Sequence, residues 1–139
     1  MESGDASIID CCLRETFEEI SLASSEIEIL GCMRSIPDRT GTLLVTPVVG
    51  WIRNPMFDPT KLKLNPDEVE ACFTLPMTDL FHRRKWDYFR DSGIRIPYWK
   101  LSLKDNGTGS IEDHGPIRLW GLTAYFVNDL QKLLSDAKL

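Results

Sequence analysis

Three carboxylates on one face of a short predicted helix are the residues of this chain best suited to chemistry. Glu15, Glu18 and Glu19 stand at positions i, i+3 and i+4 of the run from Arg14 to Glu19, and residues at that spacing share a helix face. Like charges so close repel one another, and a hard divalent cation would turn that repulsion into coordination. Arg14 can hold one carboxylate in a fixed orientation through its planar fork. The run therefore suits Mg²⁺ or Mn²⁺ bound to a diphosphate, and the alternative is a solvated acidic face.

The other face of the same helix is apolar. Ile9, Leu13, Phe17 and Ile20 recur at helical spacing and predict a stripe that packs on the rest of the fold. We expect a helix over residues 7–20, capped at its start by Ser7 or Asp5.

The acidic run resembles the core of the Nudix box, the signature of the Nudix hydrolases, which reads G-x5-E-x7-R-E-U-x-E-E-x-G-U with U a bulky apolar residue. The metal-binding core of that pattern is matched in this chain by Arg14, Glu15, Glu18 and Glu19, and its last apolar position by Leu22.

Three departures from the pattern concern the start of the box, its centre and its end. Thr16 stands where an apolar residue is usual, and Ser21 replaces the glycine after the helix. That helix end must turn without the easy positive φ of glycine. Ala6 falls where the family has glutamate, and Asp5 is the acidic candidate if one residue is inserted. The chain begins at Met1 inside the box, so we expect it to lack the strands that precede the box and to expose an unpaired strand edge or an uncovered apolar face.

The inserted residue and several downstream segments resemble the coenzyme A diphosphatase branch of the family. These segments are Gly4-Asp5, residues 43–50, residues 65–70, residues 73–77 and Trp120 to Ala124. The resemblance implies an α/β fold, a Nudix-type α/β/α sandwich with a mixed sheet, over residues 1–136. It also implies an enzyme, a diphosphate hydrolase that uses Mg²⁺ or Mn²⁺.

The resemblance also assigns roles to particular residues. Glu15, Glu18 and Glu19 would be the metal ligands, while Glu18, Glu19 and Arg14 would be the catalytic group, with Arg14 orienting a carboxylate. Glu68 and Glu70 are candidates for an extra ligand or a general base, against the alternative of exposed charge at a strand end.

No substrate-binding residue is identified by sequence. Tyr98 or Trp99 could stack on an adenine ring, although one of the two is expected in the core, and Trp120 is expected to anchor the last helix. The basic cluster from His82 to Lys85 could meet the 3′-phosphate of coenzyme A or could be solvated loop charge.

The reaction implied is the cleavage of coenzyme A or its thioesters into 3′,5′-ADP and 4′-phosphopantetheine derivatives. The alternatives are a shortened, catalytically impaired variant and a diphosphatase for another nucleotide, such as a nucleotide sugar. Acyl preference, preferred metal and oligomeric state are left open, as is whether the chain folds and works without the strands before the box.

The carboxyl-terminal tripeptide Ala137-Lys138-Leu139 is a close variant of the Ser-Lys-Leu address read by the peroxisomal import receptor. We therefore expect a peroxisomal protein, with the cytosol as the alternative. The acidic start from Met1 to Asp5 does not resemble a secretory or mitochondrial presequence.

Bulk composition is that of one globular domain. The chain has 139 residues, 42% of them hydrophobic and 27% charged, and it has no apolar run of the roughly 18 residues needed to span a membrane. A net charge of −5 argues against nucleic acid as a partner. The cysteines are expected to be reduced thiols, since no C-x-x-C pair occurs, and zinc is not expected because His82 and His114 are not spaced with them as ligands.

The remaining segments are assigned from their periodicity and turn residues. Strands are expected over 26–33, 42–52 (buried), 68–75 and 94–103, a short helix over 76–82 and a closing helix over 122–134, with loops at 54–66 and 105–109 and no assignment for 83–93.

Overall fold

The computed structural model describes residues 4–88, 93–101, 107–109 and 117–137. Several sequence predictions fall elsewhere: His114, Lys138 and Leu139 lie outside the described residues, as do positions 105 and 106 of the predicted loop. The chain divides into two compact units, one of residues 1–73 with 106–111 and the other of residues 74–105 with 112–139.

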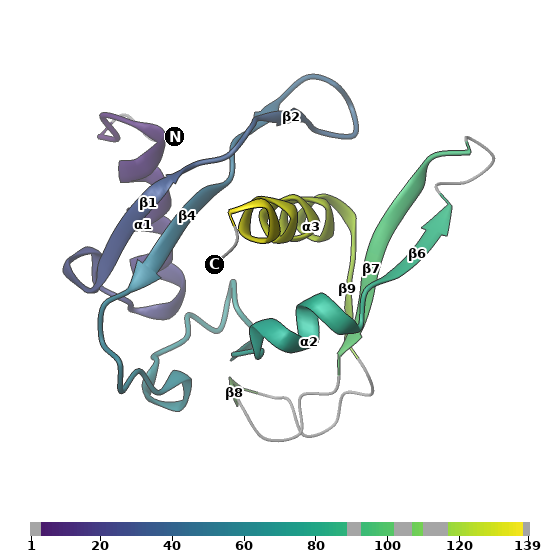
Figure 1. Cartoon of the computed structure of the whole chain (residues 1–139). Helices are drawn as coiled ribbons and strands as arrows, with labels where there is room; N and C mark the ends of the chain where they lie inside the picture. The colour runs from purple at the N-terminus through teal and green to yellow at the C-terminus, as the bar shows by residue number, and fades with distance from the viewer. Residues whose placement is uncertain (1–3, 89–92, 102–106, 110–116, 138–139) are drawn as a thin grey trace. The chain divides into compact units, whose positions relative to one another are not determined.

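The first unit is organised around helix α1 (Ile8–Ile20) and a two-stranded antiparallel sheet (Figure 1). Strand β1 (Ile27–Cys32) pairs with β4 (Val48–Ile52), and the register is interrupted by a bulge between Ile29 and Gly31. A cavity of about 210 Å³ between α1 and this sheet is lined by Cys12, Leu13, Thr16, Leu22, Ile27, Ile29, Val48, Gly50 and Ile52. The helix therefore covers one face of the sheet without filling the space against it.

Two serines, Ser7 and Ser21, form the two ends of α1. The Ser7 hydroxyl caps the amino end by accepting a hydrogen bond from the Asp10 amide at 3.1 Å, as predicted. At the carboxyl end Ser21 takes a left-handed conformation with φ 56°, and its amide donates to the Phe17 carbonyl at 2.8 Å. A serine thus occupies the turn that glycine would adopt more easily.

Shorter elements complete the first unit. A hairpin pairs β2 (Ile36–Pro37) with β3 (Leu44–Val45), and β5 (Ala71–Phe73) pairs with β8 (Gly107–Gly109). The Asp38 carboxylate accepts from the Thr40 hydroxyl and from the amides of Thr42 and Leu43, which closes the hairpin turn and lowers the pKa of Asp38 to about 2. A turn of 3₁₀ helix, η1 (Ser24–Glu26), lies between α1 and β1, and a second, η2 (Pro59–Lys61), lies between β4 and β5.

The second unit holds most of the buried side chains. Strands β6 (Lys85–Tyr88), β7 (Arg95–Leu101) and β9 (Ile117–Leu119) form an antiparallel sheet in the order β6-β7-β9. Helices α2 (Met77–His82) and α3 (Gly121–Asp136) lie on the same side of this sheet (Figure 1). The side chains packed there include Pro97, Trp99 and Leu101 from the central strand and Ala124, Asn128 and Gln131 from α3.

The predicted α/β class is confirmed, because helices combine with antiparallel sheets in a way consistent with a Nudix-type α/β/α sandwich. The strand pairs within the described ranges are antiparallel, so the parallel pairing of a mixed sheet stays a prediction. No helix in the part of the chain that the structure describes is long and apolar enough to cross a membrane.

Three sequence assignments were wrong in detail. The strand predicted over 42–52 is two strands broken at Thr46 and Pro47, and it is not buried, since Leu44 is 74% exposed. The loop predicted at 105–109 contains strand β8, which pairs with β5. The apolar stripe of α1 is not buried either, because Phe17 is 55% exposed and no residue of the helix is classed as buried.

Candidate functional site

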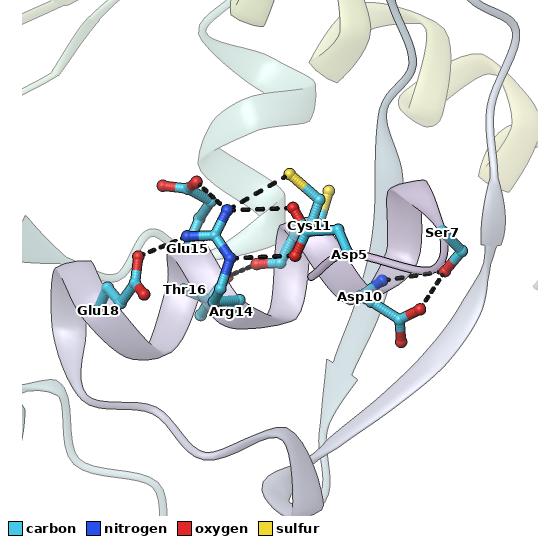
Figure 2. A network of polar contacts seen from close by, with 9 residues as sticks. Asp5, Ser7, Asp10, Cys11, Arg14, Glu15, Thr16 and Glu18 are labelled. Atoms are coloured by element: carbon cyan, nitrogen blue, oxygen red, sulfur yellow. Dashed lines mark hydrogen bonds and ion pairs between the residues drawn. The ribbon is translucent and has the colours of Figure 1, made fainter. Parts of the chain in front are cut away.

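The centre of the predicted site is the Arg14 guanidinium, which three carboxylates share (Figure 2). Its Nε lies 3.0 Å from Asp5 Oδ1 and its Nη2 lies 3.2 Å from Asp5 Oδ2, a two-point contact of the planar fork. The Asp5 side chain is only 4% exposed, whereas that of Arg14 is 24% exposed. Asp5 therefore anchors the guanidinium from the inner side, in the place where the sequence suggested an acidic partner.

Two of the predicted metal ligands take the outer positions on the same guanidinium. Nη2 lies 2.6 Å from Glu15 Oε1 and Nη1 lies 2.6 Å from Glu18 Oε2, with side chains 44% and 49% exposed. The hydrogen bonds that Arg14 donates to Asp5 and then to Glu15 raise the pKa of Arg14 above its ordinary value, so the guanidinium stays charged. Arg14 thus neutralises part of the repulsion among the acidic residues of α1.

The third predicted ligand, Glu19, ties the end of α1 to the segment that carries Glu68. The Glu19 carbonyl accepts a hydrogen bond from the Asn65 amide at 2.8 Å. The Asn65 side chain in turn donates to Glu68 Oε2 at 2.9 Å. The structure therefore brings Glu68 into the neighbourhood of the acidic helix. Glu70 is an exposed residue just before β5.

The donor set fits a divalent cation by its chemistry, since Glu15, Glu18 and Glu19 offer carboxylate oxygens from one helix. Within the described residues, however, no three His, Cys, Asp or Glu side chains are grouped closely enough to hold a metal ion. The reason is visible in the contacts: Glu15 and Glu18 point at Arg14 rather than at a shared centre (Figure 2). Both side chains are exposed, 44% for Glu15 and 49% for Glu18, so both have room to rotate away from the guanidinium.

Two hollows adjoin α1 and offer space for a ligand. One, of about 420 Å³, is lined by Asp10, Leu13, Arg14, Phe17, Ala23 and Ser24. The other, of about 520 Å³, lies under the carboxyl end of the helix and is lined by Phe17, Ser21, Leu22, Glu26, Asn54, Met56, Phe57, Asp58, Lys61, Leu62 and Lys63. The second hollow contains lysines from a segment that sequence reading treated only as a proline-containing loop.

The remaining sequence candidates lie in the second unit. Trp99 is fully buried and donates from Nε1 to the Leu80 carbonyl at 2.8 Å, so it is the core residue of the predicted pair. Tyr98 is covered by the Arg118 guanidinium, 4.2 Å from the ring centroid. Trp120 is 65% exposed at the start of α3, so the prediction that it anchors this helix by packing is not supported.

The basic cluster at His82 to Lys85 is partly structural. Arg84 donates to buried Asn128 on α3 at 2.9 Å and lies 5.2 Å from the Trp86 ring. Its guanidinium is therefore engaged in packing, and only its neighbours remain as candidates for an anion.

Two of the four cysteine thiols, those of Cys12 and Cys72, are not activated as nucleophiles. Cys11, Cys12, Cys32 and Cys72 are free, as predicted. Burial raises the pKa of Cys12 and of Cys72, which keeps both protonated near neutral pH.

Comparison with known proteins finds relatives among the Nudix hydrolases. No family model matches the chain. Nudix hydrolase 3 of Caenorhabditis elegans is 29% identical over 97% of this chain and 57% of its own length. The mitochondrial coenzyme A diphosphatase NUDT8 of Homo sapiens is 31% identical over 96% of this chain and 52% of its own length. An uncharacterised Nudix hydrolase, NudL, of Escherichia coli is 29% identical over 94% of this chain and 60% of its own length. The chain spans between half and two thirds of the length of these relatives.

Proposed function

Because this chain is a Nudix protein related to the coenzyme A diphosphatase branch, we propose that it hydrolyses a diphosphate linkage with the help of a divalent metal ion. The observation that supports the proposal most is the acidic helix α1, in which Arg14 is held by Asp5 and shared with Glu15 and Glu18. The substrate we propose is coenzyme A or one of its thioesters, since the relative NUDT8 is named a coenzyme A diphosphatase.

The roles of the residues follow from their contacts. Glu15, Glu18 and Glu19 would hold Mg²⁺ or Mn²⁺, which supplies charge neutralisation of the diphosphate and a more acidic water when bound. Asp5 keeps Arg14 in place when the outer carboxylates leave it, because its own pair with Arg14 is the buried one. Glu68, which Asn65 holds near the end of α1, is the candidate that could take a proton from the attacking water.

The experiment is release of 3′,5′-ADP from coenzyme A by the 139-residue chain in Mg²⁺ or Mn²⁺, with and without EDTA. Glu19→Gln keeps the shape of the side chain but removes its charge, and we expect turnover to fall by at least about tenfold. Glu28→Gln is the matched control, because Glu28 lies on β1 with only a distant partner, Arg53 at 3.9 Å. Metal-dependent turnover unchanged by Glu19→Gln would exclude this site.

A panel of substrates separates the proposed reaction from related ones. Coenzyme A, an acyl thioester, a nucleotide sugar and a dinucleotide share the diphosphate but differ in the attached groups. Preferential cleavage of either of the last two would move the assignment to a diphosphatase for another nucleotide.

The competing function is that of a catalytically impaired variant. It is favoured by the orientation of Glu15 and Glu18, which point at Arg14 and not at a common centre. A folded sample with a cooperative thermal transition and no metal-dependent release from any of the four substrates would support it.

Peroxisomal import is part of the same proposal and rests on the tripeptide Ala137-Lys138-Leu139. A fluorescent protein fused ahead of the chain should co-localise with a peroxisomal marker, and deletion of the tripeptide should return it to the cytosol.

A further inference from the structure

The outward face of the β6-β7-β9 sheet carries a compact group of cations that the proposed hydrolysis does not use. Helices α2 and α3 cover the opposite face, where Trp99 is buried and bonded to α2. Side chains alternate along a strand, so Ile96, Tyr98 and Lys100 point the other way from Trp99. The register places Lys85 opposite Tyr98, Asp87 opposite Ile96 and Arg118 opposite Lys100, and these three therefore share the outward face.

Like charges on this face repel one another. Lys100 and Arg118 are directly paired across adjacent strands, where side chains stand roughly 5 Å apart and like charges are destabilising. Lys85 lies on the other side of the same central strand, next to Tyr98. Three cations thus occupy register positions around Tyr98 on one face of the sheet, in a chain whose net charge is −5.

Among the described residues of this face, Arg118 is the cation that has a counter-charge. Its Nη2 lies 2.8 Å from Asp87 Oδ2, and this contact lowers the pKa of Asp87. Within the described ranges, the side-chain ammonium groups of Lys85 and Lys100 have no hydrogen bond or ion pair, and both residues take part in the sheet through their backbones alone. Two positive charges therefore remain uncompensated.

Arg118 and Tyr98 form a flat platform between these lysines. The guanidinium lies over the tyrosine ring with its central carbon 4.2 Å from the centroid, and the Arg118 side chain is 44% exposed. Asp87 fixes the guanidinium in this position. The plane that faces away from the ring is the kind of surface on which a nucleobase stacks.

We propose that this face binds a nucleotide carrying at least two phosphate groups. The base stacks on the guanidinium of Arg118, which Tyr98 backs, and the phosphates lie at the edge of this platform, within reach of the ammonium groups of Lys85 and Lys100. Bound phosphate relieves the repulsion between Lys100 and Arg118. The three cations span only about two strand spacings, roughly 10 Å, which suits one small ligand better than a polynucleotide. The site uses none of the carboxylates of α1, so failure of the proposed hydrolysis would leave it standing.

The test is calorimetric titration of the full chain with ADP, inorganic diphosphate and adenosine, all in EDTA so that no metal bridges ligand and protein. We expect ADP to bind more tightly than diphosphate, and adenosine to bind weakly. Lys100→Gln should weaken ADP binding about tenfold, because it removes a charged partner of the phosphates. Lys132→Gln is the matched control, since Lys132 is 60% exposed on α3 and already paired with Asp129.

Arg118→Lys separates stacking from charge. The variant keeps the positive charge but loses the flat guanidinium, so it should weaken ADP binding several-fold and leave diphosphate binding nearly unchanged. Circular dichroism of each variant confirms that the sheet is intact. Equal effects of Lys100→Gln and Lys132→Gln would overturn the site, and equal affinities for ADP and diphosphate would overturn its assignment to nucleotides.

Discussion

The two long helices of this protein are held in opposite ways. Helix α1 has no buried residue and is organised by an ionic network in which Arg14 contacts three carboxylates. Helix α3 buries Ala124, Asn128 and Gln131 against the sheet that contains Trp99. The polar groups of α1 therefore remain accessible to solvent, while the inner face of α3 packs against the sheet.

This difference teaches where chemistry and stability lie in the molecule. Few buried apolar contacts and exposed polar groups mark regions of low local stability, from which binding elements are commonly drawn. Residues of α1 can change partners at small cost, as the exposed carboxylates of Glu15 and Glu18 show. Substitutions in the core around Trp99 should cost more free energy of unfolding than substitutions in α1. Four substitutions test this difference.

Trp99→Ala should have the largest effect. The side chain is fully buried and its indole N–H is bonded to the Leu80 carbonyl, so the substitution leaves a cavity and an unpaired acceptor. We expect a loss of about 3–5 kcal/mol in the free energy of unfolding, measured by urea denaturation. Trp120→Ala is the control: it removes an indole that is 65% exposed and should cost under about 1 kcal/mol. Similar losses for both would mean that the second unit has no tight core.

Asp5→Asn should have the next largest effect and is the sharpest test of the ionic network. It removes the charge of the buried carboxylate that holds Arg14, whereas the carboxylates of Glu15 and Glu18 are exposed, and should cost about 1–3 kcal/mol. Glu18→Gln removes an exposed partner at i+4 and should cost about 0.5 kcal/mol or less. Thermal melts of both variants compare the two positions, and equal costs would show that Asp5 is not the anchor.

Gln131→Met should stabilise the protein. Both polar atoms of the Gln131 side chain are buried and have no hydrogen-bond partner among the described residues, and the whole residue, on the packed face of α3, is only 3% exposed. Methionine has a similar length and no amide to desolvate, so we expect a gain of about 1–2 kcal/mol in urea unfolding. Lys132→Met alters the neighbouring exposed position and should change the free energy little. A destabilised Gln131→Met would show that the amide has a partner in solution.

Ser21→Gly should give the smallest change, again a gain. Serine at φ 56° carries a steric cost that glycine avoids, partly offset by the greater flexibility of glycine in the unfolded chain. The net gain expected is about 0.5–1 kcal/mol, measured as a rise in the thermal midpoint. Ser24→Gly, at the start of η1, lacks a positive φ and should not give this gain.

Local signals in the sequence were enough for the pieces whose causes are local. The helix from Ile8 to Ile20, its Ser7 cap and the strained Ser21 turn were all readable from residue type and spacing. The strand at Ile27–Cys32 and the short helix at Met77–His82 were also predicted within a residue or two.

Features that depend on distant partners were not readable. Strand β9 is three residues long and is stabilised by its pairing with β7, so it is too short for the alternation of apolar and polar residues to predict it. Without β9, Arg118 had no known neighbours, and the cationic face that it forms with Lys85 and Lys100 could not be anticipated. The carboxylates of α1 were identified from their spacing, and Arg14 was expected to hold one of them. That Arg14 contacts Asp5, Glu15 and Glu18 together depends on side-chain rotamers that sequence does not specify.

The distribution of the four tryptophans gives the molecule a separate optical label for each unit. Trp51 is the tryptophan of the first unit and is 63% exposed, whereas Trp86, Trp99 and Trp120 belong to the second. An indole in water emits at longer wavelength and is quenched by acrylamide, while the enclosed indole of Trp99 should emit at shorter wavelength and resist quenching. The short-wavelength emission therefore reports on the core between α2, α3 and β7. A Trp51→Phe variant would isolate the light from the second unit and show whether the two units unfold together.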